Sequence, residues 1–264
     1  KLPLMLSIGL VGCIGTIYTT IGGIKSVVWT DTFQCVIIFG GFTAIIIRGS
    51  YLFEGEDSVW KIAQSGGRIS FNKFSMDPRD RDTWLGTIIG GCFNMFALVC
   101  SQSTLQRIAA SKTMKNGQNA LRLCGVLFVI YAALLSGMGW VMYAYYETTR
   151  CDPFQAGIIS NRNQLQPYFV FLTMEEYPGL RGLYLVTLFS GALSTLSSGI
   201  NALAAITVED ILKTPLKNVQ ESKATFITKV CSFLYGLLII GLAYGASSID
   251  GHLIRMTIVS VGAF

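Results

Sequence analysis

The chain has 264 residues, of which 52% are hydrophobic and 13% charged, and its mean hydropathy is +0.53. This composition is too apolar for a soluble globular domain and predicts a membrane protein with the lipid bilayer as its partner. The net charge of +5 comes mostly from lysine and arginine in short loops, and no basic stripe with interleaved aromatic residues is present. A nucleic-acid partner is therefore excluded.

Long, nearly uncharged segments recur along the chain. About 20 helical residues cross roughly 30 Å of hydrocarbon at about 1.5 Å per residue, and several segments reach that length. The sequence therefore predicts an all-α polytopic membrane protein with a single transmembrane domain over residues 1–264. Its spans are expected at residues 4–24, 27–47, 84–106, 123–146, 182–210, 228–249 and 253–264. No proline lies inside these segments, so no proline kink is expected.

Basic residues in the connecting loops indicate the orientation of these spans. Lys25, residues 107–122 and residues 213–229 carry lysine or arginine with almost no acidic residue, which places them on the cytoplasmic side. Residues 50–82 and 147–181 are then outside, and we expect a multi-pass protein of the plasma membrane. Because the chain begins without methionine and ends within an apolar segment, we also expect a fragment, incomplete at both ends.

Asp31 is an ionisable residue inside the second predicted span. A charge at the centre of a membrane helix costs about 2.5–3.5 kcal/mol or more, so Asp31 needs a partner or water. Alternatively, Asp31 lies near the start of its helix, where a carboxylate favours the positive end of the helix dipole. Gln34 follows one turn later on the same face and adds a neutral oxygen.

A second group of polar residues lies in or at the end of the third predicted span. Its members are Asn94, Ser101, Gln102, Ser103 and Gln106. Amides in hydrocarbon require partners, and hydrogen bonds between helices account for such residues as well as a binding site does.

The predicted span at residues 182–210 is rich in hydroxyls and glycines. Four of them share one helix face at spacings i, i+3, i+4 and i+7: Gly191, Ser194, Thr195 and Ser198. This face offers three hydroxyl oxygens beside a backbone carbonyl, a set that can hold a small hard cation. Close helix packing explains the residues equally well, because α-helical spacing of four relates two series of small residues. One is Ser190, Ser194 and Ser198, and the other is Gly191, Thr195 and Gly199. Both interpretations remain open.

An enzyme of this sequence would use Ser194 or Ser198 as nucleophile and His252, the single histidine, as base. The chain has no strand-turn-helix nucleophile elbow, no zinc-protease motif and no glycine-rich phosphate loop. His252 is expected to be a loop residue. We therefore expect neither an enzyme nor a cofactor.

Four motifs together resemble the solute:sodium symporter family, and the resemblance extends along essentially the whole chain. They are GGIKSVVWTDTFQ at residues 22–34, SQSTLQR at residues 101–107, FSGALST at residues 189–195 and INALAAITVEDI at residues 200–211. Within the family, the first and last motifs resemble the iodide, monocarboxylate and multivitamin branch more than the sugar branch. The resemblance implies a leucine-transporter-like bundle of inverted repeats, with discontinuous helices meeting at a midplane site.

By this resemblance, sodium is the coupling ion and the only metal expected. The Gly191 carbonyl and the Ser194 and Thr195 hydroxyls match the family's principal sodium site, whose remaining ligands lie on helices before this chain. A second sodium site, present in some members, is matched by Asp31, Gln34, Gln102 and Ser198.

The resemblance gives less information about the substrate. Asn94 matches a position that hydrogen-bonds sugar in sugar-transporting members, but Ala97 stands where those members have a tyrosine over the ligand. We therefore expect a secondary active sodium symporter that carries a small organic or inorganic anion into the cell: a monocarboxylate, a vitamin carboxylate or iodide. The alternative is a sodium-conducting pore or a non-transporting sensor of the same fold.

Overall fold

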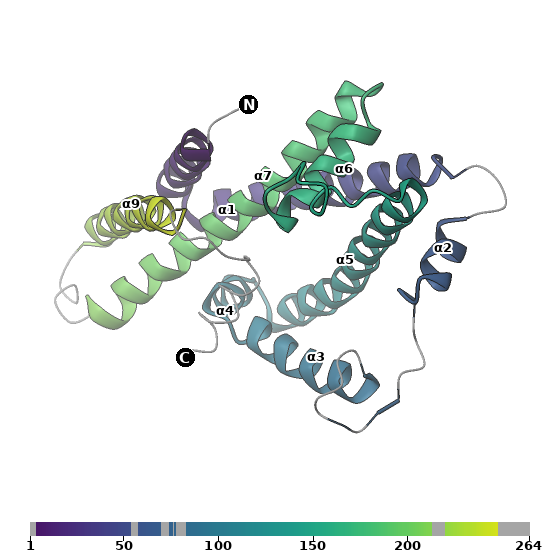
Figure 1. Ribbon diagram of the computed structural model, residues 1–264. Helices are drawn as coiled ribbons and strands as arrows, with labels where there is room; N and C mark the ends of the chain where they lie inside the picture. The colour runs from purple at the N-terminus through teal and green to yellow at the C-terminus, as the bar shows by residue number, and fades with distance from the viewer. Residues whose placement is uncertain are drawn as a thin grey trace. The chain divides into compact units, whose positions relative to one another are not determined.

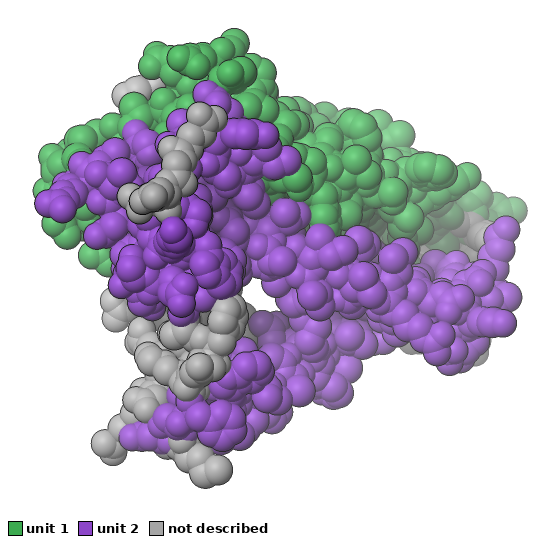
Figure 2. Space-filling model, turned by 90° about the vertical axis from the view of Figure 1, so that its right-hand side faces the viewer, with its two compact units in different colours: residues 1–45, 151–264 green, residues 46–150 purple. Residues whose placement is uncertain are grey.

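The computed structural model describes residues 4–53, 58–69, 74–75, 77, 83–212 and 220–247, and regular structure in them is helical. These residues fall into two compact units, residues 1–45 with 151–264 and residues 46–150, and each unit is described by itself (Figure 2). The longer helices are α1 (Leu4–Ser50), α2 (Val59–Ser65), α3 (Trp84–Val99), α4 (Gln102–Ala109), α5 (Met114–Thr149), α6 (Leu165–Thr173), α7 (Pro178–Ile206) and α9 (Glu221–Ala246). Two short helices, η1 (Arg162–Gln164) and η2 (Thr207–Ile211), precede α6 and follow α7.

Helix α1 is divided by a break at Gly23. Its φ of 58° and ψ of −157° are non-helical values that glycine adopts readily because it has no Cβ. The expected spans at residues 4–24 and 27–47 lie in the two segments of α1. The first segment, residues 4–22, just reaches the roughly 20 residues that one crossing requires, and the second, residues 24–50, exceeds them.

By length and composition, four of the described helices can cross a membrane: α1, α5, α7 with η2, and α9. The pair α3 and α4 makes a fifth candidate, bent by 55°. The division into seven spans stays a prediction, and its last segment, residues 253–264, lies outside the described residues together with His252.

A bend of 55° between α3 and α4 interrupts the helix within the predicted span at residues 84–106. Ser101 has φ −64° and ψ 143°, an extended conformation that starts α4. Its hydroxyl donates to the Leu98 carbonyl at 2.8 Å, and the Thr104 hydroxyl donates to the same carbonyl at 3.0 Å. The Ser101 amide also donates to this carbonyl, at 3.3 Å. The two hydroxyls thus supplement a long backbone bond at the break, as is common where membrane helices are interrupted.

In the first unit, the first segment of α1 runs antiparallel to α9 (Figure 1). The direction follows from three contacting pairs: Met5 with Tyr244, Gly12 with Ile240, and Thr16 with Gly236. A Cβ at Gly12 or at Gly236 would clash with its partner, so glycine is what lets the two helices approach this closely.

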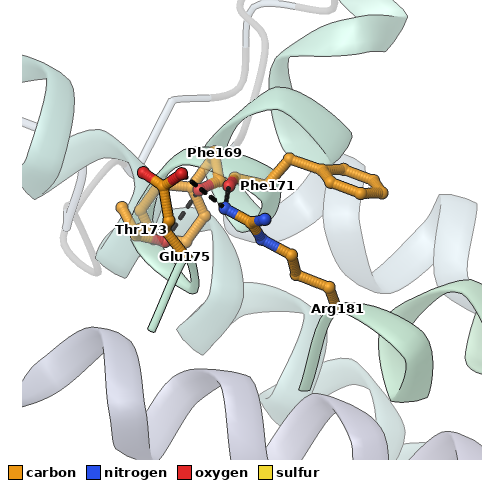
Figure 3. A network of polar contacts seen from close by, with 5 residues as sticks. All are labelled: Phe169, Phe171, Thr173, Glu175 and Arg181. Atoms are coloured by element: carbon orange, nitrogen blue, oxygen red, sulfur yellow. Dashed lines mark hydrogen bonds and ion pairs between the residues drawn. The ribbon is translucent and has the colours of Figure 1, made fainter. Parts of the chain in front are cut away.

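The turn between α6 and α7 is held by a polar network around Arg181 (Figure 3). The Arg181 guanidinium donates to the Phe171 carbonyl and lies 3.9 Å from a Glu175 carboxylate oxygen. The Thr173 hydroxyl donates to the Phe169 carbonyl at 2.7 Å, and Phe169 itself is fully buried. This network closes the end of α6 onto the start of α7.

In the second unit, α2 packs against α5 through aromatic side chains. The Trp60 and Trp140 rings meet edge to face with centroids 5.5 Å apart. The Arg68 guanidinium lies 4.8 Å above the centre of the Tyr143 ring, a favourable cation–π geometry. The short helix α2 is thereby attached to one end of the long helix α5.

Candidate functional site

The structure separates the two series of small residues on α7. Thr187 lies against Gly41, and the Ser198 hydroxyl lies 3.5 Å from an Asp31 carboxylate oxygen, so α7 runs antiparallel to the second segment of α1. Ser190, in the same series as Ser198, is buried. Packing against α1 therefore accounts for Ser190, the first member of this series.

The series that begins at Gly191 faces elsewhere. A Cβ built at Gly191 or at Gly199 would meet nothing within 4 Å, and Thr195 between them is exposed. Close packing against the helices that the structure describes does not account for these small residues. Packing thus explains Ser190 but not Gly191 and Gly199, and the ion-binding explanation stays a prediction.

On the open face, the Thr195 hydroxyl donates to the Gly191 carbonyl at 3.0 Å. The hydroxyl oxygen keeps lone pairs for a further partner after donating its proton, and the bond holds it one turn from the carbonyl. Ser194 beside it is half-buried. Neutral hydroxyl and carbonyl oxygens are hard ligands, and without a carboxylate in the set they suit a monovalent cation better than a divalent one.

Asp31 and Gln34 lie on the second segment of α1 where it faces α7. Asp31 is half-buried, and Gln34 is 8% exposed, with an amide oxygen that has no hydrogen-bond partner among the described residues. Asp31 lies more than two turns beyond the break at Gly23. Since a helix dipole acts mainly over the first turn, the capping explanation does not account for Asp31.

Asn94 and Gln102 belong to the second unit. Asn94 is exposed on α3, and Gln102 is the exposed first residue of α4, immediately after the break. Their roles at a substrate site and at a second sodium site stay predictions.

Sequence reasoning did not single out the residues that support the Ser194 turn on the side of α7 that faces α1. The Tyr18 hydroxyl on α1 donates to the Leu193 carbonyl at 3.1 Å, and the Ser197 hydroxyl donates to the Ser194 carbonyl at 3.1 Å. The one available signal was a tyrosine within an apolar segment, since a buried tyrosine hydroxyl needs a partner. Which partner it finds depends on a contact between residues 175 positions apart.

The fold defines a polytopic membrane protein, and its helix α7 exposes a face of hydroxyl and carbonyl oxygens. The chain matches the model of the Sodium:solute symporter family over residues 1–261. It therefore belongs to that family, as the motifs predicted, and membership of a family of symporters confirms that it is not an enzyme.

Curated relatives cover most of the chain. Sodium-coupled monocarboxylate transporter 2 of Bos taurus is 38% identical over 91% of this chain and 39% of its own length. The putative sodium-dependent multivitamin transporter of Drosophila melanogaster is 37% identical over 94% and 42%, and the sodium/iodide cotransporter of Homo sapiens is 36% identical over 95% and 39%. The chain thus spans about two fifths of the length of these relatives.

Among solved structures, the substrate-bound outward-open state of a Na⁺-coupled sialic acid symporter matches with a TM-score of 0.79. The match covers 94% of this chain and 51% of that chain at 22% identity. This confirms the predicted fold class, an all-α, leucine-transporter-like helical bundle in a multi-pass integral membrane protein.

Proposed function

We propose that the whole protein is a secondary active symporter that couples sodium entry to the uptake of a small anion across the plasma membrane. The anion is a monocarboxylate, a vitamin carboxylate or iodide. The names of three relatives, a monocarboxylate transporter, a multivitamin transporter and an iodide cotransporter, support this range. Ala97, in place of the tyrosine of sugar-transporting members, argues against a sugar.

The principal sodium site in this proposal consists of the Gly191 carbonyl and the Ser194 and Thr195 hydroxyls. The observation that carries it is the open face of α7, where small residues have no packing role against the described helices and Thr195 is exposed. The bond from Thr195 to the Gly191 carbonyl keeps two of the three oxygens in a fixed relation before the ion arrives.

A second sodium site is proposed around Asp31, Gln34 and Ser198. The buried amide oxygen of Gln34 and the carboxylate of Asp31 offer a negatively charged oxygen set that suits a cation. Gln102 joins this site, and Asn94 contacts the substrate, on the family resemblance alone.

Coupling between the ion and the anion follows from linkage. If sodium at the Gly191 face stabilises the state that binds the anion, each ligand tightens the binding of the other by the same factor. Each sodium ion that enters releases about 2.3 kcal/mol per 100 mV of membrane potential, in addition to its concentration gradient. That free energy is what drives the anion uphill.

Radiotracer uptake in cells that express the whole protein tests the proposal. Radiolabelled lactate, biotin and iodide are supplied with sodium, and then with choline in its place. A symporter accumulates at least one of them above its external concentration, with saturation and only with sodium. A pore conducts sodium without accumulating any tracer, and a sensor does neither, so either result contradicts the proposal.

Substitutions at Thr195 test the principal site within the same experiment. Thr195→Ala removes the hydroxyl, and we expect uptake to require about tenfold or more sodium, since a ligand to a charged group contributes about 1.5–3 kcal/mol. Thr195→Ser keeps the hydroxyl and serves as the matched control. An unchanged sodium requirement in Thr195→Ala at normal surface expression would refute the assignment.

A further inference from the structure

The first segment of α1 contacts the turn of α7 at residues 193–196 and fixes its position. The Tyr18 hydroxyl donates to the Leu193 carbonyl at 3.1 Å. One turn earlier on α1, a Cβ at Gly15 would come within 2.6 Å of Leu196 and 3.4 Å of Leu193. Tyr18 and Gly15 therefore hold the same turn, one by a hydrogen bond and the other by close packing.

This turn also carries Ser194 and Thr195. The Leu193 carbonyl and the Ser194 amide belong to one planar peptide unit, so the hydrogen bond from Tyr18 directly fixes the orientation of the backbone that precedes the Ser194 side chain. Leu193 and Leu196 contact α1, whereas Thr195 is exposed. The support and the open face thus lie on different sides of the same helical turn.

Additional hydroxyls reinforce this turn from within α7. Its carbonyls at Gly191 and Ser194 accept from the Thr195 and Ser197 hydroxyls at 3.0 and 3.1 Å, and the Leu193 carbonyl accepts from Tyr18. Hydroxyls that bond helical carbonyls compete with the backbone ladder and bend helices. An external anchor at Leu193 limits how far this turn can shift.

We infer that Tyr18 is a positioning residue for the sodium site of α7: it lowers the sodium dissociation constant through the Leu193–Ser194 peptide without touching the ion. Gly15 contributes because its lack of a Cβ lets Leu196 pack against α1. The inference rests on the proposed function, which assigns sodium to the Gly191, Ser194 and Thr195 face.

The chain supplies a matched control for Tyr18. Tyr244 on α9 likewise donates its hydroxyl to a backbone carbonyl of α1, that of Met5, at 2.9 Å, but this bond lies at the other end of the α1 segment. Tyr18→Phe and Tyr244→Phe therefore each remove one tyrosine–carbonyl hydrogen bond between helices. Only the first bond reaches the peptide before Ser194.

Binding of radioactive sodium to the purified whole protein measures the difference without knowledge of the anion. We expect Tyr18→Phe to raise the sodium dissociation constant about three- to tenfold, the effect of losing one neutral hydrogen bond, and Tyr244→Phe to leave it within about twofold. The unfolding temperatures of the two variants should be equal. Equal changes in sodium affinity, or none in Tyr18→Phe, would overturn the inference.

Two further variants separate failure of the inference from failure of the proposed function. Thr195→Ala should weaken sodium binding whether or not Tyr18 has a positioning role. If it does not weaken binding, the site itself is wrongly assigned. If Thr195→Ala weakens binding and Tyr18→Phe does not, only the positioning role is wrong. Gly15→Ala, which pushes on Leu196, should weaken sodium binding in the same direction as Tyr18→Phe, and Gly40→Ala, whose Cβ meets nothing within 4 Å, should not.

Discussion

The Ser198 hydroxyl on α7 and the Asp31 carboxylate on α1 lie 3.5 Å apart although 167 residues separate them in the chain. This is longer than the roughly 2.5–3.0 Å of an ordinary O–H···O hydrogen bond. Oxygen ligands of calcium lie at about 2.3–2.6 Å, so two neighbouring ligands at a right angle are about 3.3–3.7 Å apart, and sodium is close to calcium in size. The spacing of the two oxygens therefore suits two ligands of one cation.

A double-mutant cycle on this pair tests whether the two side chains act together. Asp31→Asn and Ser198→Ala should each raise the sodium concentration for half-maximal uptake, and the pair should show a coupling free energy of about 0.5–3 kcal/mol, as residues in one network do. Thr32→Val is the control, because Thr32 is exposed and its hydroxyl bonds its own helix at Val28. Additive effects of the two substitutions would show that the oxygens bind no common partner.

Two adjacent glycines of α1 should respond differently to alanine. A Cβ at Gly41 would clash with Thr187, a side chain that is 2% exposed and donates to the Leu183 carbonyl at 2.8 Å. Overpacking of this kind costs about 1–3 kcal/mol, so Gly41→Ala should lower the unfolding temperature in detergent. A Cβ at Gly40 meets nothing within 4 Å, so Gly40→Ala should leave it unchanged. Equal stability of the two variants would contradict the observed contact between α1 and α7.

Hydropathy was enough to predict the apolar helices, because lipid selects composition over some 20 residues at a time. It could not predict the bend after α3, since neither proline nor glycine marks Ser101 and the break depends on where two hydroxyls point. Nor could it separate the series beginning at Ser190 from that beginning at Gly191. That distinction depends on a contact between Gly41 and Thr187, which helix periodicity within α7 does not contain.

The bend between α3 and α4 should depend on either of two hydroxyls rather than on one. Ser101 and Thr104 both donate to the Leu98 carbonyl, at 2.8 and 3.0 Å. Ser101→Ala or Thr104→Val alone removes one of its two hydroxyl partners, whereas the double variant leaves it only the long bond from the Ser101 amide, at 3.3 Å.

We therefore expect small losses of thermal stability from the single variants and a larger-than-additive loss from the double. Ser136→Ala in the unbroken helix α5 is the control, since the Ser136 hydroxyl bonds the Ala132 carbonyl at 2.9 Å as an addition to a complete backbone ladder. Additivity of the two single losses would indicate that the hydroxyls do not support the bend.

The network around Arg181 should be stabilised mainly by a hydrogen bond and only slightly by its ion pair. The guanidinium donates to the Phe171 carbonyl, and a charged donor contributes about 1.5–3 kcal/mol. The Glu175 side chain is 79% exposed and 3.9 Å away, so solvent screens the pair to about 0–1 kcal/mol.

Arg181→Gln should accordingly lower the unfolding temperature of the protein in detergent, while Glu175→Gln should barely change it. Arg181→Lys keeps the charge but not the planar fork and should fall between them. If Glu175→Gln destabilised the protein as much as Arg181→Gln, the ion pair would be the principal interaction and the ranking derived from exposure would be wrong.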